Sequence, residues 1–294
     1  MPSGKDPSAH HANNRESIAD VYSHLQIVAR TKKRPFPEIA RYYAMERFLY
    51  RMSVSKYKAS FFLKGGLMLM VWNPTSHRAT LDIDLLARTN NSIENFTNIF
   101  QTICSLEVPP DGVLFDTRQL TFTESQLDAE YRGLSVRFSA QLARMQIPMR
   151  LDIGFSDKIL PHPVDVHYPV LLEFPRPILK GYTPETSIAE KLDAIVRLGL
   201  INTRMKDFYD IWIMLEQFQM KQEQLAPIIA EIFKHRETRV RNIPKAFTER
   251  FYSNPKTIEL WNVFLKGIGH QPIPLKTVIA RLDAFFTPIL DKMK

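Results

Sequence analysis

Apolar residues recur every three to four positions in two segments near the start of the chain, which predicts two helices. The first segment has its apolar stripe between Ile18 and Val28, and the second covers residues 37–53. The run TKKRPFP separates them, because its prolines interrupt a helical backbone. Two packed helices are therefore expected before the sheet begins.

From residue 60 onward apolar and polar residues alternate over short runs, which is typical of half-buried strands. The segments predicted as strands are 60–63, 81–86, 113–115, 117–122, 134–142, 149–155, 170–174 and 177–179. A helix is predicted over 92–106, and the apolar run that ends at Trp72 fits either a helix or an extended segment. This part of the chain is therefore mixed α/β.

The pattern changes near residue 180, after which only helical spacing recurs. Thr183 followed by Pro184 is a typical helix start, because threonine caps the first turn and proline fits the first helical position. Further helices are predicted over 207–217, 224–234, 257–266 and 275–290. We expect a flexible amino terminus (1–14), an α/β domain with its leading helices (15–180) and an all-helical domain (181–294).

A Gly-Gly turn and an Asp-x-Asp strand lie close together in the sequence. In a strand over 81–86, the side chains of Asp82 and Asp84 lie on one face and the apolar side chains on the other. Their Cα atoms are then about 7 Å apart, the length of two strand rises. Gly65 and Gly66 allow backbone N–H groups to approach a phosphate closely. Together these residues predict a site for a divalent metal and a triphosphate.

A lone Asp-x-Asp strand is more often a surface feature than a metal site, so the prediction depends on the nearby glycine turn. In the strand over 149–155, Asp152 also faces away from the apolar side and can supply a third carboxylate. Asp157 competes for this role, although it follows Ser156 in a predicted turn. A third carboxylate completes the set that two-metal phosphoryl transfer needs.

Two later segments carry charged residues away from their apolar stripes. Lys206 and Asp210 share one side of a predicted helix, where they form either a solvated i, i+4 salt bridge or a pair that faces a cleft. Lys191 also lies off its apolar stripe, and it is either exposed or within reach of a triphosphate. Spacing alone favours exposure for Lys191.

Composition narrows the class of partner and the compartment. The 294-residue chain has a formal net charge of +8, which favours an anionic partner such as a nucleotide or nucleic acid. Its one cysteine, Cys104, excludes an intramolecular disulfide and lies in an apolar-periodic run, as a buried thiol would. A polar amino terminus and the lack of a long apolar run predict a cytoplasmic protein with neither signal peptide nor membrane span.

Four ordered motifs resemble the AbiEii/AbiGii nucleotidyltransferase toxin family, which includes the MenT toxins. They are LKGGLMLMVW, HRATLDIDLL, SIAEKLDAIVRLG and RMKDFYDIW, within a likeness that covers residues 18–265. The resemblance implies a DNA polymerase β-like nucleotidyltransferase fold with a mixed sheet. It also implies a helical carboxy-terminal half that closes over the nucleotide.

The resemblance further implies roles for individual residues. The expected metal ligands are Asp82, Asp84 and, by analogy of fold, Asp152. The expected nucleotide contacts are Lys64, Gly65, Gly66, Arg78, Lys191 and Lys206. The expected catalytic residues are Asp82, Asp84, Asp152, Lys191 and Asp210. Leu67 departs from the family, in which many members have serine or threonine after the two glycines.

The reaction that the resemblance implies is transfer of a nucleoside monophosphate from an NTP, with two Mg²⁺ ions as cofactors. The implied acceptor is RNA, above all the 3′ end of tRNA, so that translation is blocked, and a cognate antitoxin is the other expected partner. The alternatives are a protein or small-molecule acceptor, or a non-catalytic nucleic-acid-binding protein. A basic cluster is a candidate for acceptor phosphates or else a solvated helix end: Lys234, Arg236, Arg239, Arg241 and Lys245.

Overall fold

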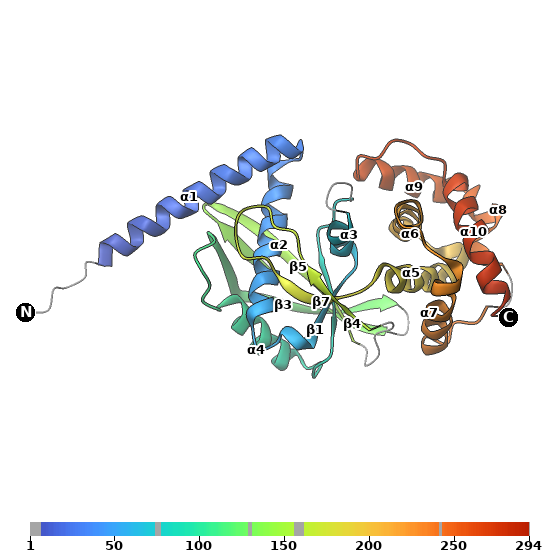
Figure 1. Cartoon of the computed structure of the whole chain (residues 1–294), viewed down its shortest axis with the longest axis horizontal. Coiled ribbons are helices and arrows are strands. Elements are labelled where there is room, and N and C mark those ends of the chain that lie inside the picture. Colours follow the sequence, from blue (N-terminus) through green and yellow to red (C-terminus); the bar gives the residue numbers. More distant parts are fainter. Residues whose placement is uncertain (1–6, 74–77, 129–130, 156–161, 241–242, 294) are drawn as a thin grey trace, which may run out of the picture. The chain divides into compact units, whose positions relative to one another are not determined.

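The computed structural model describes residues 7–73, 78–128, 131–155, 162–240 and 243–293, and these form two compact units (Figure 1). The first unit contains the β-sheet and includes Val164–Gly181. The second unit combines Lys158–Pro163 with Tyr182–Lys294, and its regular elements in the described part are helices. None of the described helices combines the length and the apolar character that a bilayer crossing requires.

A mixed sheet forms the centre of the first unit, and its described strands have the order β3-β4-β5-β2-β1-β7-β6. The strands are β1 (Phe61–Lys64), β2 (Ile83–Ala87), β3 (Val113–Asp128), β4 (Tyr131–Leu142), β5 (Met145–Phe155), β6 (Val164–His167) and β7 (Ile178–Gly181). Strand β2 pairs in parallel with β5, and β1 with β7, whereas the other neighbours are antiparallel. The three central strands therefore come from three separate parts of the chain.

Helices cover the apolar face of the central strands. The helices of this unit are α1 (Pro7–Lys32), α2 (Phe36–Val54), α3 (Gly66–Trp72) and α4 (Ile93–Cys104), with a 3-10 turn η1 (Lys58–Ser60). Helix α2 contacts β4, β5 and β7, and α4 contacts β3 and α2. The alternating side chains of Ile83, Leu85, Leu151 and Ile153 are at most 1% exposed. Their polar neighbours on β2 and β5 consequently lie on the opposite face.

The segment 170–174 is not a strand, so that prediction is wrong, and Val164–His167 pairs with β7 instead. The backbone N–H of Leu171 donates to Glu46 Oε2 at 2.7 Å, which ties the segment to α2. Prolines flank this segment, and they lack the N–H that a ladder needs. Local alternation therefore cannot distinguish this extended segment from a paired strand.

The two predicted strands over 113–115 and 117–122 are one long strand, β3. The one residue between the two predictions, Asp116, is the last before the register with β4 shifts, between Asp116 and Thr121. An irregularity of this kind interrupts the pairing with the neighbouring strand without ending the strand.

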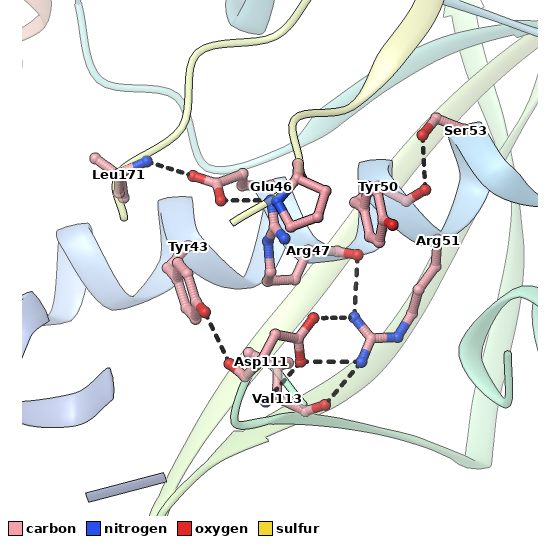
Figure 2. Close-up of polar contacts among 10 residues, drawn as sticks. Tyr43, Glu46, Arg47, Tyr50, Arg51, Ser53, Asp111, Val113 and Leu171 are labelled. Atoms are coloured by element: carbon pink, nitrogen blue, oxygen red, sulfur yellow. Dashed lines mark hydrogen bonds and ion pairs between the residues drawn. The ribbon is translucent and has the colours of Figure 1, made fainter. Parts of the chain in front are cut away.

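A charged pair is buried beneath α2 (Figure 2). Arg51 donates through Nη1 and Nη2 to the two carboxylate oxygens of Asp111, at 2.6 and 3.0 Å, and the side chains are 7% and 2% exposed. Arg51 also donates to the carbonyl of Val113 at 3.1 Å, and the hydroxyl of Tyr43 donates to the carbonyl of Asp111 at 2.8 Å. These bonds fasten α2 to the segment that leads into β3.

We expect Asp111→Asn to lower the free energy of unfolding by about 3–5 kcal/mol, because it leaves the buried Arg51 guanidinium without its carboxylate. Urea unfolding followed by circular dichroism measures this change. The control is Asp116→Asn, since Asp116 pairs with an Arg118 side chain that is 87% exposed. Loss of that solvated pair should change stability little. Equal effects of the two substitutions would contradict the stabilising role of the buried pair.

The second unit is built from helices around α5. Its helices are α5 (Pro184–Leu198), α6 (Met205–Gln217), α7 (Gln222–His235), α8 (Glu249–Tyr252), α9 (Pro255–Gly267) and α10 (Leu275–Asp291), with 3-10 turns η2 (Gly199–Ile201) and η3 (Lys245–Phe247). Thr183 Oγ1 accepts the backbone N–H of Thr186 at 3.2 Å, so the predicted cap of α5 is confirmed. Helix α5 packs against both α6 and α7, which places Lys191 beside α6.

Candidate active site

The Gly65–Gly66 turn joins β1 to α3 and lies against β2. Gly65 has a φ of +67°, a conformation that favours glycine. A Cβ atom on Gly65 would lie 2.0 Å from Oδ2 of Asp84, so this position has no room for a side chain. The backbone N–H of Gly66 donates to the same oxygen at 3.3 Å. The turn thus brings its backbone into direct contact with the Asp84 carboxylate.

Basic side chains lie beside this turn. A Cβ atom on Gly66 would lie 3.4 Å from Nη1 of Arg78 and 2.8 Å from Oγ1 of Thr80. Lys64 is half-buried and stands opposite Asp84 in the β1–β2 ladder. Both cations are therefore near the glycine turn, and their contact with a nucleotide stays a prediction.

The predicted carboxylates lie on or directly beside the sheet, although the strand predicted over 81–86 begins only at Ile83 and leaves Asp82 outside it. Asp84 and Asp152 stand directly opposite each other in the parallel pairing of β2 with β5, and Asp82 lies one residue before β2. Neighbouring strands are about 4.8 Å apart, so the backbones of Asp84 and Asp152 are close. The parallel pairing of β2 with β5 thus brings Asp152 next to Asp84.

Arg150 on β5 lies between two of these carboxylates. Its Nη2 atom is 3.0 Å from Oδ2 of Asp152, and its Nη1 atom is 3.9 Å from Oδ2 of Asp82. Arg150 is not among the predicted site residues, although it alternates with Leu151 in the same way as Asp152 and so shares its face. The carboxylates therefore already attract a cation that belongs to the protein.

The residues on this face fit a divalent metal in their chemistry. Among the residues that the structure describes, no three Asp, Glu, His or Cys side chains converge closely enough to hold a metal ion. Carboxylate oxygens are nevertheless the ligands that Mg²⁺ prefers, and a guanidinium is attracted to the place between Asp82 and Asp152. A metal at that place requires the Arg150 side chain to move.

The second unit holds the remaining predicted residues around Lys191 on α5. The Nζ atom of Lys191 is 3.0 Å from Oδ1 of Asp207 and 2.9 Å from Oδ2 of Asp210. Both carboxylates are fully buried, and Lys191 is only 14% exposed, so the exposure that spacing alone favoured for Lys191 is wrong. Nε of Arg204 lies 2.6 Å from the other oxygen of Asp207. The ammonium of Lys191 is therefore held by two carboxylates.

Charge compensation outweighs burial at Asp207. Burial by itself would raise the pKa of this carboxyl, but the Lys191 ammonium and the Arg204 guanidinium lower the pKa below its usual value. Asp207 consequently stays ionised at neutral pH and keeps its attraction for Lys191.

The interpretation of Asp210 as part of a solvated salt bridge with Lys206 is wrong. Asp210 is fully buried and pairs with Lys191, whereas Lys206 is exposed. The physical reason is that α5 packs against α6 and covers the side that the helical period alone assigns to solvent. Asp207 is not among the predicted site residues, although its i, i+3 spacing from Asp210 places both on one side of α6.

Other sequence candidates have mixed outcomes. In the basic cluster, Arg236 pairs with Asp193 at 3.0 Å and Glu190 at 3.1 Å, which indicates a structural role. Lys234, Arg239 and Lys245 are exposed, whereas Arg241 and Asp157 lie outside the described residues.

The predicted burial of Cys104 is confirmed. This burial raises the pKa of its thiol to about 12, so the thiol is a poor nucleophile.

Comparison with known proteins supports the fold and the class of chemistry. The family described as "Nucleotidyl transferase AbiEii toxin, Type IV TA system" matches residues 47–287. The crystal structure of JHP933 from Helicobacter pylori has a TM-score of 0.51 at 12% identity, covering 87% of this chain and 93% of that chain. A second H. pylori structure, described as a candidate nucleotidyltransferase, has a TM-score of 0.48 at 14% identity and covers 87% and 95%. The curated proteins contain no match. The predicted α/β nucleotidyltransferase fold with a mixed sheet and following helices is confirmed.

Proposed function

Because this chain belongs to the AbiEii nucleotidyltransferase toxin family, we propose that it transfers a nucleoside monophosphate from an NTP to the 3′ end of tRNA. The observation that carries the proposal is the position of Asp84, opposite Asp152 and in contact with the Gly65–Gly66 turn. The modified tRNA could not be aminoacylated, so translation would stop. The net charge of +8 suits an RNA acceptor.

In the proposed reaction the terminal hydroxyl of the acceptor attacks the α-phosphorus of the NTP. A new oxygen–phosphorus bond forms, the bond to the β-phosphate oxygen breaks, and pyrophosphate leaves. Mg²⁺ ions, when bound, supply charge neutralisation of the triphosphate and a lower pKa of the attacking hydroxyl. Asp82, Asp84 and Asp152 are the proposed ligands, and Asp152 is also the proposed acceptor of the hydroxyl proton.

The chain's own donors and cations are the proposed contacts of the nucleotide. Leu67 lacks the hydroxyl that many family members have, and it is fully buried in the core. Phosphate contacts therefore fall to the backbone of Gly65 and Gly66 and to the side chains of Lys64 and Arg78. In the second unit, Lys191 and the exposed Lys206 are proposed to offset triphosphate charge, with Asp207 and Asp210 positioning Lys191.

The protein is also proposed to have an antitoxin partner and to act in the cytoplasm. The family is described as part of type IV toxin–antitoxin systems, so a cognate antitoxin is a proposed partner. Since NTPs and tRNA are both cytoplasmic, the cytoplasm is the proposed place of action.

The test incubates the purified protein with Mg²⁺, total tRNA and each α-³²P-labelled NTP in turn. We expect at least one NTP to label the RNA, and we expect tRNA whose 3′ ribose has been oxidised by periodate to remain unlabelled. Asp82→Ala should give no label, because it removes a proposed metal ligand. The control is Asp165→Asn. Asp165 lies on the edge strand β6 and pairs with Lys180, so this variant should label tRNA as the wild type does.

Three outcomes would contradict parts of this proposal. Label on protein or on a small molecule would replace RNA as the acceptor. Equal label on intact and oxidised tRNA would place the modification away from the 3′ end. No label with any NTP, or full activity of Asp82→Ala, would overturn the proposed mechanism.

A further inference from the structure

The guanidinium of Arg150 joins carboxylates from two parts of the first unit. Its Nε atom donates to Oδ1 of Asp152 at 3.3 Å and to Oγ of Ser135 at 3.3 Å. Its Nη2 and Nη1 atoms lie 3.0 Å from Asp152 and 3.9 Å from Asp82. Arg150 thus contacts the Asp152 carboxylate through two nitrogen atoms, and its third nitrogen points toward the Asp82 carboxylate.

Burial makes a cation necessary here. The side chain of Asp152 is only 11% exposed, and a carboxylate removed from water needs a compensating charge. The side chain of Arg150 is 43% exposed, so its outer end has access to solvent. This geometry gives Asp152 a stable partner that can leave without disturbing the core.

A divalent cation bound by Asp82 and Asp152 would compete with this guanidinium. Both cations would occupy the space between the same oxygens, and two positive charges about 4 Å apart repel each other strongly. An arginine that leaves the carboxylates also has a suitable second partner, because its planar fork matches the oxygens of a phosphate group.

We propose that Arg150 is an internal counterion that occupies the cation position between Asp82 and Asp152 and weakens metal binding in the absence of nucleotide. This inference rests on the proposed function, because the competing ion is the metal of nucleotidyl transfer. An arriving triphosphate draws Arg150 away from the carboxylates and opens the position. Metal and NTP then bind more tightly together than either binds alone.

The test measures Mn²⁺ binding to the full-length, nucleotide-free protein by electron paramagnetic resonance, so that no catalytic turnover is involved. Arg150→Gln should bind Mn²⁺ more tightly than the wild type, by on the order of tenfold, because a repelling charge is removed. Arg150→Lys, which keeps the charge but not the planar fork, should bind with intermediate affinity. Arg88→Gln removes the same charge at the far end of β2, where Arg88 packs on Phe62, and should differ little from the wild type.

A second measurement, with nucleotide added, tests whether the triphosphate draws Arg150 away from the carboxylates. With a non-hydrolysable NTP analogue, the Mn²⁺ affinity of the wild type should rise by a larger factor than that of Arg150→Gln. Unchanged or weaker Mn²⁺ binding by Arg150→Gln, with a normal circular dichroism spectrum, would overturn the inference.

Asp84→Asn distinguishes failure of this inference from failure of the proposed function. If Asp84→Asn loses Mn²⁺ binding but Arg150→Gln binds as the wild type does, only the inference on Arg150 is wrong. If Asp84→Asn binds Mn²⁺ as the wild type does, or no variant binds it, the proposed metal site is wrong as well.

Discussion

Gly65→Ala is expected to reduce nucleotidyl transfer by at least about 100-fold, because small displacements of reacting groups have effects of this size. The added Cβ would lie 2.0 Å from Oδ2, 2.5 Å from Cγ and 2.6 Å from Cβ of Asp84. Such contacts are impossible, so either the turn or the carboxylate must shift. The initial rate of label transfer measures the loss, and thermal unfolding shows whether the variant is folded at the assay temperature.

Two other glycines provide matched controls for this substitution. Gly269 has the same φ of +67°, but a Cβ there would meet nothing within 4 Å, so Gly269→Ala isolates backbone strain. Gly267 has neither a positive φ nor a neighbour within 4 Å. Gly267→Ala should therefore be neutral or slightly stabilising. Activity should fall in Gly65→Ala and persist in both controls.

The comparison can also contradict the proposed site. If Gly65→Ala is folded and transfers label at the wild-type rate, contact between the turn and Asp84 is not needed for the chemistry. If Gly269→Ala loses as much activity as Gly65→Ala, general destabilisation explains both results.

Lys191→Met is expected to abolish label transfer and to lower the free energy of unfolding by about 3–5 kcal/mol, since it leaves buried carboxylates without their ammonium partner. Asp207 keeps its bond to Arg204, whereas Asp210 loses the contact at 2.9 Å. The double variant Lys191→Met/Asp210→Asn should recover part of the stability but none of the activity. Denaturant unfolding and label transfer on the same preparations separate these two effects.

The stability difference between wild type and Lys191→Met should depend on pH in a defined direction. In the wild type the pKa of Asp207 is lowered, so its contribution to stability is present above the unfolded pKa and is lost as pH falls through the folded value. Without Lys191 much of that contribution is absent. The difference in unfolding free energy should therefore be largest near neutral pH and should narrow below about pH 4.

Lys206→Met is the control for this prediction. Lys206 lies on the same helix as Asp207 but is exposed, so its loss should leave the free energy of unfolding nearly unchanged. A loss of stability as large as that of Lys191→Met would show that removal of any positive charge destabilises this unit. Wild-type activity of Lys191→Met would rule out its proposed role with the triphosphate.

The two charge clusters share one physical principle on different elements. At each, acidic side chains with little solvent exposure are held by a basic side chain that keeps partial access to water: Arg150 is 43% exposed and Lys191 is 14% exposed. A cation of this kind can turn its charged end without losing its apolar contacts, but the carboxylates that it leaves then need another positive charge. In each cluster the basic side chain therefore stabilises the fold and also has an end that a ligand in solvent can reach.

The sequence by itself determined the elements and the local arrangement of the main motif. Alternation placed Asp84 on the polar side of its strand, because side-chain direction in a strand depends only on position. Two adjacent glycines predicted a backbone turn, and Thr183 with Pro184 predicted the start of α5. The strand alternation, the turn and the helix start each depend on residues that are neighbours in the sequence, and they could be predicted for that reason.

Only the tertiary structure decided which distant residues meet. The parallel pairing of β2 with β5 sets Asp152 opposite Asp84, and it brings Arg150 to the carboxylates. The packing of α5 against α6 buries Asp210 and gives it Lys191 as a partner in place of Lys206. Strand register and helix packing depend on the fit of whole surfaces, whereas periodicity reports only the direction of each side chain. The charge partners that decide the behaviour of these carboxylates therefore could not be read from spacing.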